Sequence, residues 1–183
     1  MSRTATIRET SPPVVCGEVS LDVAVRLAAV RPEELIEFAA SACEAAAGTL
    51  SGTKRLTNQG RVDILITSDA RMRALNRDFR GKDRTTDVLS FPAADCGDFA
   101  LAGDIAISAG LARENARRFG HSLADELKIL ILHGMLHLAG HDHESDRGQM
   151  ARVEARLRRE FHLPAALIAR NGQGSRRARR LPR

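Results

Sequence analysis

Residues 127–143 read LKILILHGMLHLAGHDH, and this stretch decides how the rest of the chain is arranged. Its first part is apolar on nearly every side, which predicts a helix buried in the interior rather than an amphipathic surface helix. His133 and His137 are four residues apart, so on a helix both imidazoles lie on one face, one turn apart. Gly140 offers the left-handed conformation that ends a helix, and His143 follows it. We therefore expect the three imidazoles to meet.

Three convergent imidazoles indicate an open metal site. Catalytic zinc sites use three protein ligands and leave the fourth position to water or substrate. The sequence thus predicts one Zn²⁺ per chain on His133, His137 and His143, with another divalent transition metal as the alternative. His141 would be needed as a fourth ligand if the metal were structural. Asp142 either orients a ligand imidazole or bonds the backbone of its own turn.

The order H-x3-H-x2-G-x2-H is also the spacing of metzincin proteases, with one difference. Metzincins have Glu after the first His, and that Glu is the general base. Gly134 stands at this position here and has no side chain that can accept a proton. A metalloprotease is therefore a rival that the missing Glu argues against.

The composition is that of an ordinary globular protein with a basic end. Charged residues make up 28% and hydrophobic residues 43% of 183 residues, and the net charge is +5. Six Arg and no acid lie between Arg170 and Arg183, which leaves 22 basic against 23 acidic residues in the remainder. Tyr and Trp are absent and Phe is sparse. This argues against a sheet that stacks single-stranded bases on many aromatic side chains.

The same patterns predict the domain boundaries and the location. We expect a flexible leader at 1–17, a single catalytic metallohydrolase domain at 18–165, and an Arg-rich, disordered tail at 166–183. Three widely separated cysteines do not suggest a disulfide framework. No signal-peptide core is present, and the longest apolar run is too short to span a bilayer. These features favour the cytoplasm.

Hydrophobic periodicity and capping residues predict the elements. Strands are expected at Val19–Val25, Val62–Thr67, Asp87–Phe91 and Gly103–Ser108. Helices are expected from Pro32 to Gly48, after Ser68 with Met72, Leu75 and Phe79 on the apolar face, from Ser108 to Phe119, after Ser122, and after Asp146. The predicted fold class is α+β, with a small mixed β-sheet packed against several helices and the metal site on a buried central helix.

A second motif makes the chain resemble a known family. Residues 76–92 read NRDFRGKDRTTDVLSFP and are followed by Gly103-Asp104-Ile105. Together with the histidine motif they resemble the YbeY family of bacterial single-strand-specific metallo-endoribonucleases, over roughly Val19 to Phe161. Many family members have Pro where this chain has Thr85. The resemblance does not extend to the leader or the tail.

The resemblance implies specific roles. His133, His137 and His143 match the family's zinc ligands, and Arg80 matches an arginine regarded there as essential. It implies a zinc-dependent single-strand-specific endoribonuclease that acts in 16S rRNA 3′-end maturation and ribosome quality control. The implied partners are single-stranded RNA, 16S rRNA, and the ribosome or small-subunit assembly proteins, with no membrane. No pattern indicates an oligomeric state.

Alternatives remain for the function and for several residues. A metalloprotease-like hydrolase and a non-catalytic ribosome-assembly factor with a structural metal are the rival functions. Arg80 either binds a phosphate bidentately or only complements a helix end. Lys82 and Arg84 either belong to a solvated charged turn or contact the RNA backbone. Ser90 and Asp104 either only end strands or lie near the pocket.

Overall fold

The structure, a computed structural model, describes residues 18–49, 60–93, 103–143 and 146–164. Within them the order of elements is β1 (Val19–Val23), α1 (Pro32–Ala47), β2 (Val62–Thr67), α2 (Asp69–Arg80), β3 (Val88–Pro92), β4 (Gly103–Ser108), α3 (Ala109–Phe119), α4 (Leu123–Leu138) and α5 (Gln149–Glu160). The expected leader and tail lie outside the described residues.

The four described strands form one mixed sheet in the order β1-β2-β4-β3. β1 pairs with β2 and β2 with β4 in parallel, whereas β3 pairs with β4 antiparallel at the edge. Ile64 lies opposite Ile105 in the β2–β4 register, and both side chains are buried. Asp63 and Asp104 alternate with them and point to the other face. The predicted α+β class with a mixed sheet is confirmed.

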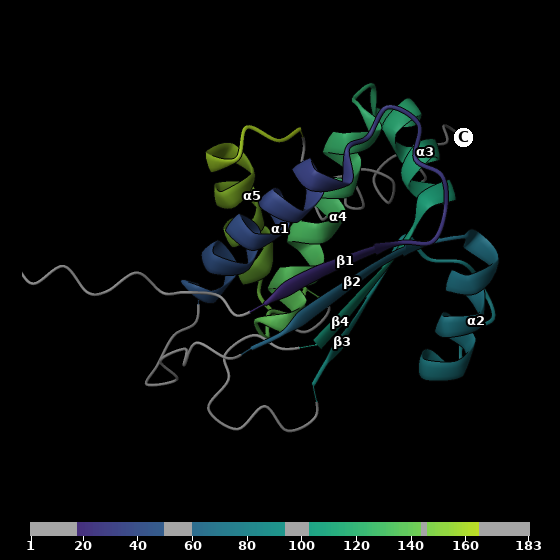
Figure 1. Cartoon of the computed structure of the whole chain (residues 1–183). Coiled ribbons are helices and arrows are strands. Elements are labelled where there is room, and N and C mark those ends of the chain that lie inside the picture. Colours follow the sequence, from purple (N-terminus) through teal and green to yellow (C-terminus); the bar gives the residue numbers. More distant parts are fainter. Residues whose placement is uncertain (1–17, 50–59, 94–102, 144–145, 165–183) are drawn as a thin grey trace, which may run out of the picture.

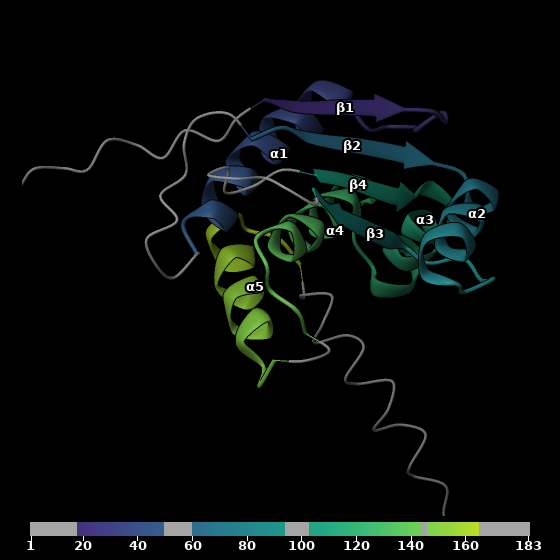
Figure 2. The ribbon, with the colours of Figure 1, turned by 90° about the horizontal axis from the view of Figure 1, so that it is seen from below.

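One face of the sheet carries the main core. α1 and α4 pack against each other and against this face, while α3 and α5 contact α4 (Figures 1 and 2). α2 lies apart from them, where it follows the carboxyl end of β2 (Figure 1). α4 is buried along most of its length, including Leu127, Leu130 and Met135. The helix that was expected to be central is therefore the one that contacts the edge strand β3, α1, α3 and α5.

Local signals set most of the element boundaries. The side chains of Ser68, Ser108 and Ser122 each accept a hydrogen bond from the third backbone N–H that follows, and each begins a helix. The boundary of β3 differs from the prediction, because Pro92 is the last residue of the strand and does not lie after its end. An edge strand tolerates Pro because one side of its backbone has no ladder partner.

Two expectations about side chains are wrong. Phe79 was placed on the buried face of α2, but 67% of it is exposed. Helical spacing put Phe79 in line with Met72, yet the buried residues of α2 are Met72 and Asn76, and in its last turn Phe79 contacts only the edge of the sheet, at Phe91. Cys43 is disulfide-bonded, contrary to the expectation from cysteine spacing. The other two cysteines lie outside the described residues.

None of the helices in the described ranges has the length and apolar character needed to cross a membrane.

Candidate metal centre

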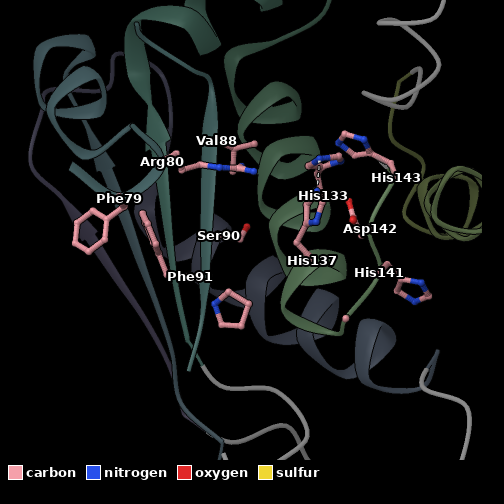
Figure 3. Close-up of a pocket in the computed structure, with 12 residues that line it drawn as sticks. Phe79, Arg80, Val88, Ser90, Phe91, His133, His137, His141, Asp142 and His143 are labelled. Atoms are coloured by element: carbon pink, nitrogen blue, oxygen red, sulfur yellow. Dashed lines mark hydrogen bonds between the residues drawn. The ribbon is translucent and has the colours of Figure 1, made fainter. Parts of the chain in front are cut away.

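His133 and His137 come from the last two turns of α4 and point into a common space (Figure 3). Their Nε2 atoms are 3.1 Å apart. His133 is 4% exposed, because α4 is surrounded by other elements at this level. The i, i+4 spacing thus produces the predicted pair, and the buried helix fixes its direction.

A tight turn brings His143 to the same space. Gly140 has a φ of 84°, and its N–H donates to the His137 carbonyl at 2.9 Å. His141 N–H donates to the Leu136 carbonyl at 3.0 Å, which completes a Schellman motif. The chain reverses here, and the His143 ring centroid lies 5.3 Å from that of His133 and 5.2 Å from that of His137.

The three side chains fit a metal ion. One ligand atom from each of His133, His137 and His143 lies within 4.8 Å of the others. Two nitrogens bound tetrahedrally at about 2.0–2.1 Å from zinc are about 3.3 Å apart. The 3.1 Å between His133 Nε2 and His137 Nε2 is close to that value. The group can therefore hold one ion, with only three protein ligands.

Glu154 of α5 stands behind the centre. Its Oε2 lies 3.3 Å from His133 Nδ1, on the side of the ring opposite Nε2. The Glu154 side chain is buried, with 1% of the residue exposed. A carboxylate on the second nitrogen fixes the proton at Nδ1 and leaves Nε2 as the metal-binding atom.

Burial keeps the site ready to bind a cation. The pKa of His137 is lowered from 6.5 to about 4, first because burial disfavours the imidazolium and then because His133 and His143 lie close by. A neutral imidazole is the form that binds metal. The metal-free site therefore keeps His137 in its binding form well below neutral pH.

The centre forms one wall of a cleft of about 590 Å³. Val88, Ser90 and Pro92 of β3 line the facing wall, and Arg80 closes one end. In Figure 3 the Arg80 side chain extends from the end of α2 toward the three histidines. The cleft thus places three metal-binding nitrogens opposite one guanidinium.

The turn after Arg80 is held by its neighbours. Gly81, with a φ of 65°, ends α2. Arg73 donates to both oxygens of Asp83 at 2.7 Å, and the buried Asn76 donates its amide N–H to the Arg84 carbonyl at 2.7 Å. These bonds fix the backbone that leads from Arg80 into β3.

Gly134 has a packing role in this structure. A Cβ at Gly134 would lie 2.9 Å from the Cδ1 and Cγ2 atoms of Ile105 on β4. Real Cβ atoms essentially never come that close. The close contact between α4 and the sheet therefore leaves no room for a side chain at residue 134. It also leaves the site without a carboxylate base at this position.

The remaining candidates divide between the cleft and other places. His141 donates or accepts at Thr49 Oγ1 through Nε2 at 2.8 Å and is not part of the three-histidine group. Asp142 and Ser90 line the cleft, and Ser90 Oγ donates to the Gly134 carbonyl at 3.4 Å. Asp104 lines a second cavity instead. Lys82 and Arg84 are exposed and are not among the described residues that line the cleft.

Glu154 was not predicted, although the sequence contains a signal for it. Met150, Glu154 and Leu157 are spaced i, i+4 and i+7 and are all buried on α5. A carboxylate on the apolar stripe of a helix needs a partner in the interior, and such a residue marks a functional or structural contact.

An α+β fold with an open three-histidine site opposite a guanidinium defines a candidate metallohydrolase. A family model described as Endoribonuclease YbeY matches residues 26–162. The chain therefore belongs to the YbeY family of endoribonucleases, so the family and the enzyme class predicted from the sequence are confirmed.

Two relatives that share the family's name agree with the family match. The protein of Koribacter versatilis named Endoribonuclease YbeY is 54% identical over 120 residues, covering 66% of this chain and 77% of that protein. The one of Solibacter usitatus is 55% identical over 117 residues, covering 64% and 77%. The solution structure of TM1509 from Thermotoga maritima is 26% identical, with a TM-score of 0.49, and covers 76% of this chain and 85% of that chain.

Proposed function

We propose that this chain is a zinc-dependent, single-strand-specific endoribonuclease. The observation that carries the proposal is the cleft that combines three metal-binding imidazole nitrogens with Arg80. In this proposal His133, His137 and His143 are the metal ligands, and Arg80 is the catalytic residue. Residues 18–165 are the catalytic domain, flanked by a leader at 1–17 and an Arg-rich tail at 166–183.

His133, His137 and His143 would hold the zinc. When bound, it would lower the pKa of a coordinated water to about 7, so that a nucleophile would be available at neutral pH without a carboxylate base. The chain's own residues prepare this chemistry. His133 is oriented by Glu154, with Oε2 3.3 Å from Nδ1. His137 is held neutral by burial, which lowers its pKa to about 4.

Arg80 would bind the scissile phosphate. Hydrolysis of a phosphodiester increases the negative charge on the non-bridging oxygens, and a planar guanidinium can donate to two of them at once. Arg80 is suited to this because it lines the cleft and extends toward the histidines (Figure 3). The bonds in the turn that follows it hold the backbone from which the Arg80 side chain extends.

The two rival functions are less well supported. A structural zinc normally has four protein ligands, and the fourth candidate, His141, bonds Thr49 instead. A protease of this spacing needs a Glu at residue 134, where a Cβ already collides with Ile105. The open three-histidine site on this fold therefore favours a nuclease.

The cellular role follows from membership in the family. We propose that the enzyme acts in the cytoplasm on 16S rRNA, in 3′-end maturation and ribosome quality control, together with the ribosome or small-subunit assembly proteins. The relatives' name supports the endoribonuclease step, and the resemblance of the two motifs supports the role in rRNA.

The test is a cleavage assay with single-stranded RNA, duplex RNA and casein, with and without chelator. Chelator-sensitive cleavage of single-stranded RNA alone is expected, and His137→Ala should abolish it. The matched control is His162→Asn, because His162 is exposed, and Asn tolerates its φ of 54°. Casein hydrolysis would support the protease. Metal binding without any cleavage, on free RNA or on ribosomal particles, would support the assembly factor.

A further inference from the structure

An exposed phenylalanine and a half-buried one form an aromatic pair at the edge of the cleft. Phe79 of α2 and Phe91 of β3 meet edge to face, with ring centroids 5.0 Å apart and an interplanar angle of 62°. Phe79 is 67% exposed, although large apolar side chains are usually buried in a folded protein. Both residues line the cleft that the three histidines line, and also a second cavity of about 480 Å³. The pair therefore lies where the two hollows meet at the edge of the sheet.

The position of this pair is tied to Arg80. Phe79 precedes Arg80 in the last turn of α2, so the two side chains leave the helix in different directions. Figure 3 shows Arg80 extending toward the histidines and Phe79 lying away from them. Phe91 supports the ring of Phe79 from the strand. Arg80 and the aromatic pair line the same cleft, so an RNA strand bound there with a phosphate at Arg80 can bring a nearby base to this ring.

The charged residues around the pair favour a phosphate on one side of it and an uncharged base on the other. The side near Arg80 continues into the turn with Lys82 and Arg84, which are exposed. The second cavity carries Asp22 and Asp104, together with Asp63, which is ion-paired with Arg61. Carboxylates repel the RNA backbone, whereas an uncharged base can lie on an aromatic ring beside them. The chain therefore has an aromatic surface at the boundary between a cationic and an anionic region.

We propose that the aromatic pair is a stacking subsite for one nucleobase of the RNA, beside the phosphate that Arg80 binds. This inference rests on the proposed function and adds a binding residue to it. Only an unpaired base, turned out of its strand, can place its face on Phe79, because the bases of a duplex are stacked on one another. The subsite thus contributes to the preference for single strands. The low aromatic content of the sequence argues against a sheet covered with aromatic side chains, and a single aromatic pair is compatible with that low content.

The test compares Phe79→Ala, Phe79→Leu and Phe79→Tyr on a short single-stranded RNA. Loss of base stacking costs about 1–3 kcal/mol, so KM for Phe79→Ala should rise roughly 5- to 150-fold. Phe79→Leu should resemble Phe79→Ala, because Leu is apolar but has no ring, and Phe79→Tyr should resemble the wild type. The control is Phe119→Ala, since Phe119 is the other large apolar residue that is exposed in the described part of the chain, and it is not among the residues lining the cleft.

RNAs that lack one base at successive positions around the mapped cleavage site identify the stacked nucleotide. At one position the missing base should weaken the wild type and leave Phe79→Ala unchanged. A Phe79→Ala protein that cleaves every RNA like the wild type would overturn the subsite. So would a defect confined to ribosomal particles, which would assign the pair to a protein partner. Failure of the metal-loaded wild type to cleave any RNA would instead refute the proposed function.

Discussion

Replacing Glu154 with Gln tests whether α5 takes part in the metal centre. The substitution keeps the size of a side chain that is 1% exposed and removes only its charge. Hydrogen bonds to charged groups contribute about 1.5–3 kcal/mol and neutral ones about 0.5–1.5 kcal/mol, so roughly 1–1.5 kcal/mol is lost at His133 Nδ1. Metal affinity should therefore fall about 5- to 12-fold.

Glu154→Ala should be more severe. It leaves the Nδ1–H of His133, 3.3 Å from Glu154 Oε2 in the wild type, without this acceptor. Removal of a carboxylate partner from a ligand histidine typically costs about 10- to 100-fold in metal affinity. We expect the Ala variant to lie toward the larger value, and the Gln variant toward the smaller.

The assay is a competition titration of Zn²⁺ against a chromophoric chelator, with the absorption spectrum of the Co²⁺ form as a second readout. Glu160→Gln is the matched control, because Glu160 is an exposed carboxylate on the same helix. The melting temperature of the metal-free Gln variant should stay near that of the wild type. The positioning role would be refuted if Glu154→Gln and Glu154→Ala both had the zinc affinity and the cobalt spectrum of the wild type.

Four further outcomes are expected. Arg80→Lys should keep fold and metal but lose about 10²- to 10³-fold in single-turnover RNA cleavage at matched zinc, because Lys cannot donate bidentately; near-wild-type cleavage would reduce Arg80 to a positive charge. Gly134→Glu should hydrolyse no peptide and should melt at a lower temperature, since its Cβ would lie 2.9 Å from Ile105. The pKa of His137 is lowered to about 4, so between pH 6.5 and 4 the unfolded chain takes up a proton that the folded chain does not. The free energy of unfolding of the metal-free protein should therefore fall as the pH falls through this range, and it should fall less in the His137→Asn variant. Deleting residues 166–183, with their six Arg, should flatten the salt dependence of RNA affinity without altering the single-turnover rate at saturation, and an unchanged slope would contradict a role for the tail.

The sequence predicted that three histidines would meet because the geometry of this group is local. The positions of His133, His137 and His143 depend on one helix, one left-handed Gly and one turn, and each leaves a mark within a few residues. Strand and helix boundaries were predictable for the same reason, since serine caps and alternating apolar residues act at short range. The confirmed fold class follows from these local signals added together.

What the sequence did not reveal depends on contacts between distant segments. Glu154 reaches His133 across 21 positions, and its role is visible only once α5 is packed on α4. The exposure of Phe79 depends on where α2 ends relative to the sheet, which helical periodicity alone does not determine. Both residues interrupt an otherwise regular pattern, one as a buried acid and the other as an exposed aromatic. Such interruptions are expected at functional sites.

The two walls of the cleft come from different parts of the chain, so something must keep them at a fixed separation. The metal-binding wall belongs to α4 and the turn after it, whereas the wall with Arg80 belongs to α2 and β3. β3 is an edge strand, paired only with β4 among the described strands. Its side chain Ser90 donates to the Gly134 carbonyl of α4 at 3.4 Å, and Gly134 in turn packs on Ile105 of β4. The absence of a side chain at residue 134 therefore lets α4 approach the sheet, and the Ser90 bond holds β3, which lines the facing wall, against the helix that carries His133 and His137.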